Sequence, residues 1–164
     1  MSTAVVRPGR ACRFGRIVNG MTTSPRPRIT LHDPGELIAA IPPLLGFRPV
    51  DSLVLAVFGG AGQAELRLTV RADLPPPTLH NELANHLVNP LLRVDSCAVT
   101  LVVVGGGVGG DSPGSLPHRE LVAVVEKVLN HVDVPVLHSL WVDAIRTGAL
   151  WRCYDDADCA GTVP

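Results

Sequence analysis

Four polar residues near two predicted strand ends have side chains suited to acid–base or nucleophilic chemistry. Asp51 and Ser52 precede an apolar run, and Arg71 and Asp73 close the alternating segment that follows. The glycine-rich stretch 59–62 predicts a tight hairpin turn, which would place Asp51 opposite about Arg71, with Asp73 at the strand exit. These four are our candidate catalytic residues. Ser52 lacks the G-x-S-x-G elbow of serine hydrolases, so an Asp–Arg pair that only ties two strand ends is the competing interpretation.

Cys153, Cys159 and His138 are a second set with possible chemistry, as ligands of a metal ion. The two cysteines are separated by five residues. That is wider than the spacing of about two to four residues in zinc knuckles, and a third ligand would have to be a distant histidine such as His138. We favour reduced thiols over this metal site, because no signal peptide is recognised and cytoplasmic proteins rarely keep disulfides. No structural disulfide, metal or cofactor is therefore expected.

A glycine motif follows one of the apolar runs. Gly105, Gly107 and Gly110 satisfy the pattern G-x-G-x-x-G. In a dinucleotide-binding fold the third glycine lies in the helix after the strand, whereas here the Pro-containing stretch 111–117 delays the helix. No lysine follows for a P-loop. The motif therefore predicts a loop and not a nucleotide site.

A capped helix and a buried strand must position the first of these residue sets. Asp33 can cap a helix N-terminus, and Glu36 sits at the carboxylate position of a capping box. A helix over 34–41 is predicted, with Pro42–Pro43 kinking or stopping it. The run 53–58 is apolar at every position, as in a strand that is covered on both faces.

The remaining hydrophobic pattern predicts strands and helices in alternation. Strands are expected at 52–58, 64–72, 97–104, 134–142 and 149–154, and further helices at 78–92 and 118–131. Together these predict an α/β fold, a mixed sheet with an N-terminal β-hairpin, crossover helices and a C-terminal β-hairpin. A five-residue loop in the C-terminal hairpin would place Trp141 directly across from Trp151.

Several of these segments together resemble a known family. The likeness is carried by Pro34-Gly35-Glu36-Leu37, Leu45-Gly46-Phe47, Pro49, Asp51-Ser52-Leu53-Val54 and Arg71-Ala72-Asp73-Leu74-Pro75. They are similar to the N-terminal part of an actinobacterial domain of unknown function, the family numbered 4192, and the likeness extends over 29–164. The resemblance implies no activity, because none is established for that family.

Composition restricts the kinds of partner that the protein can have. The chain has 164 residues, 46% of them hydrophobic, which suffices for one domain with its own core. Residues 1–28 contain six arginines and no acid, interrupted by Gly and Pro, so a disordered basic tail is predicted before one domain over 29–164. No run is long enough to span a membrane, and an aromatic content of 4% argues against a stacking platform for single-stranded nucleic acid. Nucleic acid is not the expected partner. We expect a cytoplasmic protein.

The C-terminal stretch 161–164 is turn-like and no closing helix precedes it, whereas similar family members continue further. We therefore predict an incomplete domain, whose exposed apolar surface would favour self-association or a protein partner. Two classes of function remain open. One is a small-ligand-binding or enzymatic domain that uses the four polar residues, and the other is a non-catalytic protein-interaction module. A truncated, non-functional fragment is a further alternative.

Overall fold

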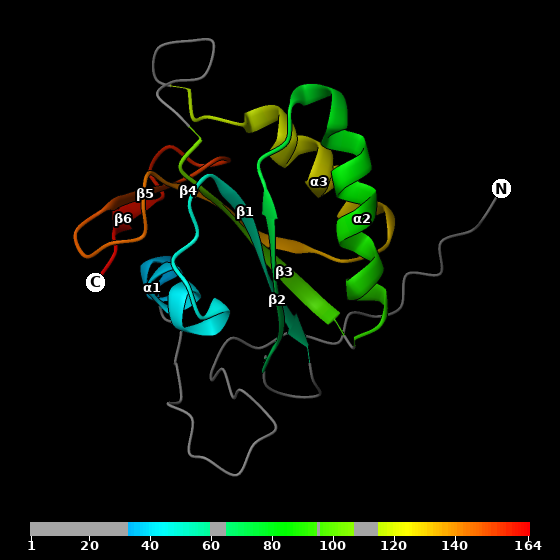
Figure 1. Cartoon of the computed structure of the whole chain (residues 1–164), viewed down its shortest axis with the longest axis horizontal. Coiled ribbons are helices and arrows are strands. Elements are labelled where there is room, and N and C mark those ends of the chain that lie inside the picture. Colours follow the sequence, from blue (N-terminus) through cyan, green and yellow to red (C-terminus); the bar gives the residue numbers. More distant parts are fainter. Residues whose placement is uncertain (1–32, 60–64, 95, 107–114) are drawn as a thin grey trace, which may run out of the picture.

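The computed structural model describes residues 33–59, 65–94, 96–106 and 115–164, and in these ranges the chain forms a six-stranded sheet with helices on both faces (Figure 1). Along the sheet the strands are ordered β2-β1-β3-β4-β5-β6. In chain order the elements are α1 (Pro34–Leu45), β1 (Ser52–Gly59), β2 (Glu65–Asp73), a 3-10 turn (Pro77–Leu79), α2 (His80–Leu92), β3 (Ser96–Val104), α3 (Arg119–His131), β4 (Val136–Val142), β5 (Leu150–Cys153) and β6 (Ala160–Thr162). The predicted basic tail 1–28 lies outside the described residues.

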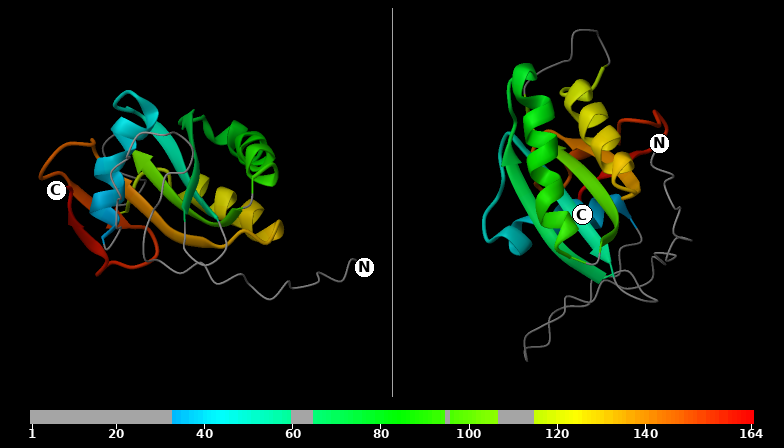
Figure 2. Two further views of the ribbon diagram at one scale, coloured as in Figure 1. Left: turned by 90° about the horizontal axis from the view of Figure 1, so that it is seen from below. Right: turned by 90° about the vertical axis from the view of Figure 1, so that its right-hand side faces the viewer.

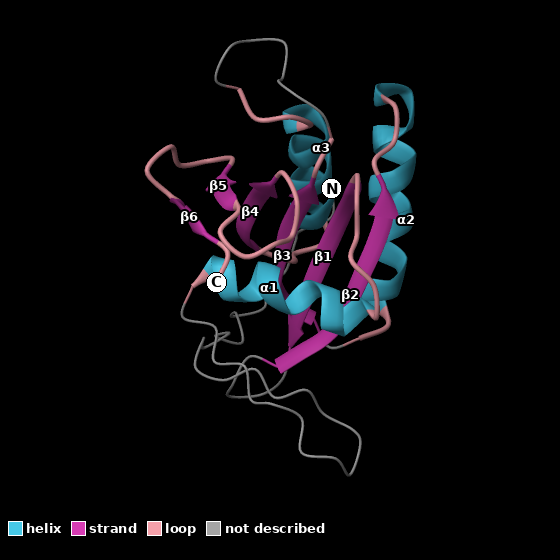
Figure 3. Cartoon of the chain, turned by 60° about the vertical axis from the view of Figure 1, so that its left-hand side comes forward, coloured by secondary structure: helices cyan, strands magenta, loops and turns pink. Residues whose placement is uncertain are grey.

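The strand directions make the sheet mixed, as Figure 3 shows. β1 pairs antiparallel with both β2 and β3, whereas β3 and β4 are parallel and are joined through α3. β4, β5 and β6 continue in antiparallel order. The predicted α/β class with a mixed sheet is therefore confirmed. β6 was not predicted, because its three residues are too few to show a strand period.

Two helical layers cover the sheet. α2 and α3 lie on one face and α1 crosses the other (Figures 1 and 2). Every residue of β1 is buried. Leu53, Leu55 and Val57 pack in the cluster under α2 and α3, while Val54 packs in the cluster under α1. This double cover explains why the run shows no polar alternation. Among the described residues, none of the helices combines the length and apolar character needed to cross a bilayer.

Both ends of α1 carry caps. The Asp33 carboxylate accepts a hydrogen bond from Gly35 N at 2.9 Å, so the predicted N-cap is confirmed. The predicted end at residue 41 is wrong, because the helix continues through Pro42 and Pro43. It ends at Gly46, whose left-handed φ of 81° lets its N–H donate to Pro42 O at 2.8 Å. This closing bond keeps the last turn helical although two of its residues have no amide proton.

The two tryptophans lie on opposite faces of the sheet. Trp141 pairs with Arg152, and Trp151 pairs with Val142. The predicted direct pairing of the two indoles is therefore wrong by one residue, and a slip of one residue moves a side chain to the other face. The cause is the length of the connection: Val142 and Trp151 are the pair nearest the turn, so the eight residues 143–150 lie between paired residues, in place of the five assumed.

The Trp151 indole is wedged between two glycines from distant parts of the chain. A Cβ atom at Gly35 would lie 2.9 Å from Trp151 Nε1, and one at Gly161 would lie 2.7 Å from Cζ2 of the same ring. The indole is buried in the cluster that includes α1. Because glycine has no side chain, Gly35 and Gly161 leave room for the Trp151 indole to pack between α1 and β6.

We expect Gly161→Ala to lower the free energy of unfolding by about 1–3 kcal/mol, because the added methyl group overlaps the indole. Urea unfolding followed by tryptophan fluorescence measures the change. Ala160→Ser, at an exposed position of the same strand, is the matched control and should remain within about 0.5 kcal/mol of the parent protein. Equal stability of the two variants would contradict the tight packing around Trp151.

Candidate functional site

Ser52, Arg71 and Asp73 meet at the open end of the β1–β2 hairpin. Ser52 pairs with Asp73 across the two strands. Arg71 Nε donates to Ser52 Oγ at 2.9 Å, and Arg71 Nη2 donates to Asp73 Oδ1 at 2.5 Å. The guanidinium carbon also lies 5.9 Å from the centre of the Phe47 ring, within range of a cation–π contact. The structure thus brings together three of the four predicted residues, with Arg71 at the centre.

The Ser52 hydroxyl is enclosed and engaged. Its residue is 0% exposed, and Oγ donates to Val50 O at 2.7 Å while it accepts from Arg71. A nucleophilic serine needs a base to take its proton, but here the proton is directed at a backbone carbonyl. The geometry is that of a side chain that closes the turn before β1.

Asp51 does not face Arg71, so the predicted register is wrong. Arg71 pairs with Val54. Asp51 lies level with Leu74, whose N–H donates to Asp51 O at 3.1 Å. Two features displace the register: the strands are joined by residues 60–64, and the pairing shifts between Val57 and Phe58. A bulge adds one residue to one strand, whereas the predicted register rested on a tighter turn without a bulge. The turn residues themselves lie outside the described ranges.

Instead, the Asp51 carboxylate holds the backbone that follows β3. Asp51 Oδ1 accepts from Gly106 N at 2.9 Å, and the residue has a left-handed φ of 44°. His118 Nε2 lies 3.2 Å from Gly106 O, and Trp141 Nε1 donates to Gly105 O at 2.9 Å. Both glycines have positive φ, 74° and 88°, which favours residues without Cβ. Three side chains from distant segments therefore anchor two consecutive residues at the carboxyl end of β3. Gly107 and Gly110 of the glycine motif lie outside the described residues.

Tyr154 fixes the approach to α3. Its hydroxyl donates to Pro117 O at 2.5 Å, and Arg119 Nη1 donates to Tyr154 O at 3.0 Å. The Arg119 guanidinium lies 5.7 Å from the centre of the same ring. Burial raises the pKa of Tyr154 far above its ordinary value, and the positive charge of Arg119 offsets this only in part. The helix start at Arg119 agrees with the predicted delay after the glycine motif.

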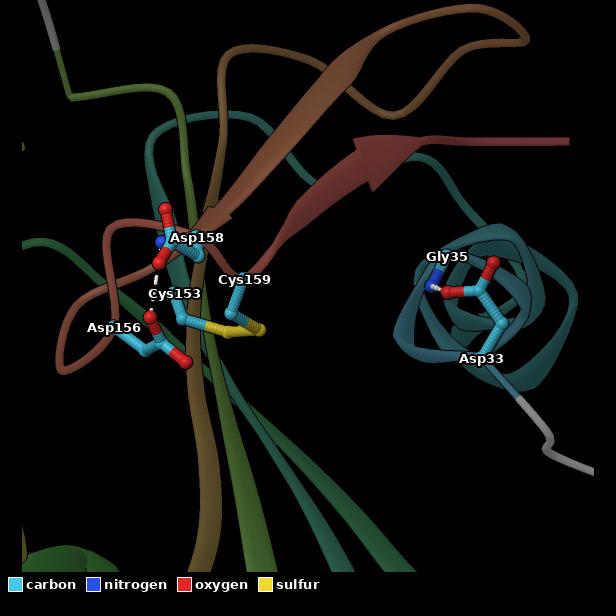
Figure 4. The surroundings of a disulfide bond; sticks show 6 residues. All are labelled: Asp33, Gly35, Cys153, Asp156, Asp158 and Cys159. Atoms are coloured by element: carbon cyan, nitrogen blue, oxygen red, sulfur yellow. Dashed lines mark hydrogen bonds between the residues drawn. A yellow bond between two sulfur atoms is a disulfide. The ribbon is translucent and has the colours of Figure 1, made fainter.

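The cysteine pair corrects another expectation. Cys153 and Cys159 form a disulfide with their Cα atoms 5.4 Å apart, although no disulfide was predicted (Figure 4). Cys153 N donates to Cys159 O at 2.9 Å where the chain turns back after β5, and this brings the two residues within bridging distance. His138 completes the predicted trio, because ligand atoms of all three residues lie within 4.8 Å of one another.

A groove of about 540 Å³ lies between α2 and α3, which are neighbours in Figure 2. Its apolar lining is Val88, Val124, Val128 and Val132, and its polar lining is Asn81, Asn85, Asn89, His86, Lys127 and His131. No residue of the predicted catalytic or metal sets is among these. This set was not predicted, although asparagine recurs there at every fourth residue, a spacing that places side chains on one helix face.

We expect Asp51→Ala to speed hydrogen exchange of the Gly106 amide by about fivefold. The variant removes a charge-assisted hydrogen bond, and solvent exposure places its contribution near the lower end of such bonds, about 1 kcal/mol. Asp51→Asn is the matched control, because it keeps an acceptor oxygen and tolerates the left-handed backbone. An unchanged exchange rate in Asp51→Ala would show that the carboxylate does not hold this backbone.

Tyr154→Phe should flatten the loss of stability at alkaline pH. Because the raised pKa keeps the native tyrosine protonated, its contribution is complete below about pH 10 and falls as pH rises, by up to about 1.4 kcal/mol per pH unit. Urea unfolding at several alkaline pH values measures the slope. Tyr154 is the only tyrosine, so tyrosinate absorbance reports its ionisation directly. The same slope in both proteins, or tyrosinate formation before unfolding, would contradict this expectation.

Comparison with known proteins identifies the chain at the family level. A family model described as Domain of unknown function (DUF4192) matches residues 34–164. No curated protein and no solved structure matches the chain. The match spans nearly all of the described residues and all of the elements that carry the clusters above. The chain therefore belongs to the DUF4192 family.

Proposed function

We propose that the domain is a non-catalytic binding module that holds an acidic peptide segment, in extended conformation, in the groove between α2 and α3. The observation that carries this proposal is the charge of the groove. Its lining contains Lys127, His86 and His131 and no aspartate or glutamate, whereas residues 29–164 as a whole contain 15 acidic and, with the six arginines of 1–28 taken from the total of 14, eight basic residues. A locally basic groove on an acidic body favours a partner of negative charge.

The asparagine row supports a main-chain ligand. Asn81, Asn85 and Asn89 follow one another at intervals of four residues, each step a rise of about 6.0 Å along a helix. An extended peptide repeats every two residues, or about 6.7 Å. A carboxamide can donate to a carbonyl and accept from an N–H, so each asparagine can pair with alternate peptide units. Asparagine is a poor helix former, so the three asparagines on this face lower the stability of α2. The described contacts show no structural benefit that would offset this cost.

The floor and size of the groove fit the same ligand. Valines of both helices supply apolar surface for one or two side chains of the peptide. The volume of about 540 Å³ lies within the range of about 300–1,000 Å³ that is usual for binding sites. A short segment of a partner protein would therefore be sufficient to fill it.

A small-ligand-binding or enzymatic role for Asp51, Ser52, Arg71 and Asp73 remains a prediction. Their polar atoms bond one another or nearby backbone, which supports an anchoring role more than a reactive one. A cytoplasmic location is likewise a prediction. The apolar patch expected of an incomplete domain is likewise still a prediction.

Panning the full chain against a displayed library of random short peptides tests the proposal. We expect enrichment of sequences with aspartate or glutamate, with binding that weakens as salt is raised. Lys127→Glu should weaken the selected peptides at least about tenfold, and Asn85→Ala about fivefold for the loss of about 1 kcal/mol of hydrogen bonding.

The matched control is Ala123→Gln, which changes an exposed position of α3 outside the lining and should leave binding unchanged. Two results would overturn the proposal: no enrichment above a surface without protein, or peptides that bind Lys127→Glu as well as the parent chain. Mass spectrometry of metabolites retained by the purified protein extends the test. A metabolite whose binding is abolished by Asn85→Ala, and which competes with no peptide, would also overturn it.

A further inference from the structure

His138, Cys153 and Cys159 form a cluster of metal-ligating side chains on the β4–β5–β6 side of the sheet. One ligand atom from each residue lies within 4.8 Å of the others. His138 belongs to β4, Cys153 ends β5, and Cys159 directly precedes β6. Figure 4 shows the two sulfurs together with Asp156 and Asp158 of the segment that joins them.

Strand pairing brings these groups together independently of the sulfur–sulfur bond. The backbone hydrogen bond from Cys153 N to Cys159 O aligns the two cysteines. Cys153 pairs with Leu140 of β4, and His138 lies two residues before Leu140, so its side chain projects from the same face. The three ligands therefore remain neighbours when the disulfide is reduced.

We propose that the reduced cluster binds one Zn²⁺ ion through Cys153 Sγ, Cys159 Sγ and a ring nitrogen of His138. Two thiolates and an imidazole are ligands that zinc favours, whereas Mg²⁺ and Ca²⁺ prefer oxygen. Bond lengths of about 2.3 Å to sulfur and about 2.0 Å to nitrogen place the ligands of one tetrahedral zinc about 3.5–3.8 Å apart. The three ligand atoms lie within 4.8 Å of one another, so small side-chain adjustments would bring them to that spacing.

The proposed site has an open fourth position. Three protein ligands leave one tetrahedral corner for water, and the exposed side chain of His138 makes that corner accessible to solvent. Three aspartates between the cysteines, Asp155, Asp156 and Asp158, add negative charge that favours a divalent cation. Asp156 Oδ1 already accepts from Asp158 N at 2.9 Å, which orders this segment.

Disulfide and zinc exclude each other, because both use the same two sulfurs. A dithiol reductant gives two electrons to the sulfur–sulfur bond and two protons to the cysteines, and becomes a cyclic disulfide. Zn²⁺ then binds the two sulfurs and displaces their protons to solvent. A small-molecule disulfide reverses the change: it takes up two electrons from the cysteine thiolates and two protons from solvent and is cleaved to two thiols, the cysteine sulfurs bond again, and Zn²⁺ is released. The zinc form thus belongs to reducing compartments.

Cobalt titration of the full chain tests this site. The protein is reduced with a dithiol, which is removed without air before Co²⁺ is added. We expect one equivalent to bind with a thiolate-to-cobalt charge-transfer band in the near ultraviolet, and Zn²⁺ to abolish that band. The chain oxidised to the disulfide should show no band, and a second reduction should restore it.

Single substitutions test the contribution of individual ligands to cobalt binding. His138→Ala changes an exposed side chain and should weaken cobalt binding at least about tenfold, since even supporting residues of metal sites contribute that much. Cys153→Ser should lose most of the charge-transfer intensity. Cys12→Ser changes a cysteine that is not one of the three proposed ligands and should retain the charge-transfer band and the cobalt affinity. Absence of the band in the reduced parent chain, or an undiminished affinity in His138→Ala, would overturn the proposal. If Cys153→Ser fails to fold, His138→Ala still decides.

Discussion

Burial of β1 on both faces is the constraint on which the rest of the fold depends. The strand pairs with a neighbour on each side and contacts α1 above and the α2–α3 layer below. A strand in this position cannot carry polar groups along its length without leaving them unsatisfied. Its one buried hydroxyl, on Ser52, stands at the first residue, where a backbone carbonyl and Arg71 are within reach. Polar side chains are thereby excluded from β1 beyond its first residue.

The carboxyl end of β3 is engaged largely in hydrogen bonds that have a structural role. In open α/β sheets, ligands commonly bind beyond the carboxyl ends of parallel strands. Here the carboxyl end of β3 is held by Asp51, His118 and Trp141, which bond the backbone of Gly105 and Gly106. Each of these side chains comes from a different segment, so the connection toward α3 leaves the sheet at a defined point. The groove in which we propose peptide binding lies elsewhere, between α2 and α3.

The edge of the sheet formed by β5 and β6 is held by few backbone hydrogen bonds. β5 and β6 are short, and β6 adds few backbone hydrogen bonds to the sheet. Short edge strands bury little surface and gain from an additional link. Cys153 and Cys159 provide one whether their sulfurs are bonded to each other or to a shared metal ion. The contact of Trp151 with Gly35 and Gly161 ties the same edge to α1.

The sequence by itself determined the elements whose signals are local. The apolar run of β1, the Asp33 cap and the delayed start of α3 follow from residue type and spacing within a few positions. Tertiary structure alone decided which residues meet. Asp51 does not face Arg71, and the tryptophans face opposite ways, because a bulge and the length of one connection each change the register. Asp51 instead contacts Gly106, because β1 pairs with β3 so that Ser52 lies opposite Val104. The Cys153–Cys159 pair depends on the pairing of β5 with the chain that returns to it. The groove lined by asparagines depends on the packing of α2 against α3. Such contacts depend on many weak interactions between distant segments, whereas a helix cap or a strand period depends on neighbours in the chain.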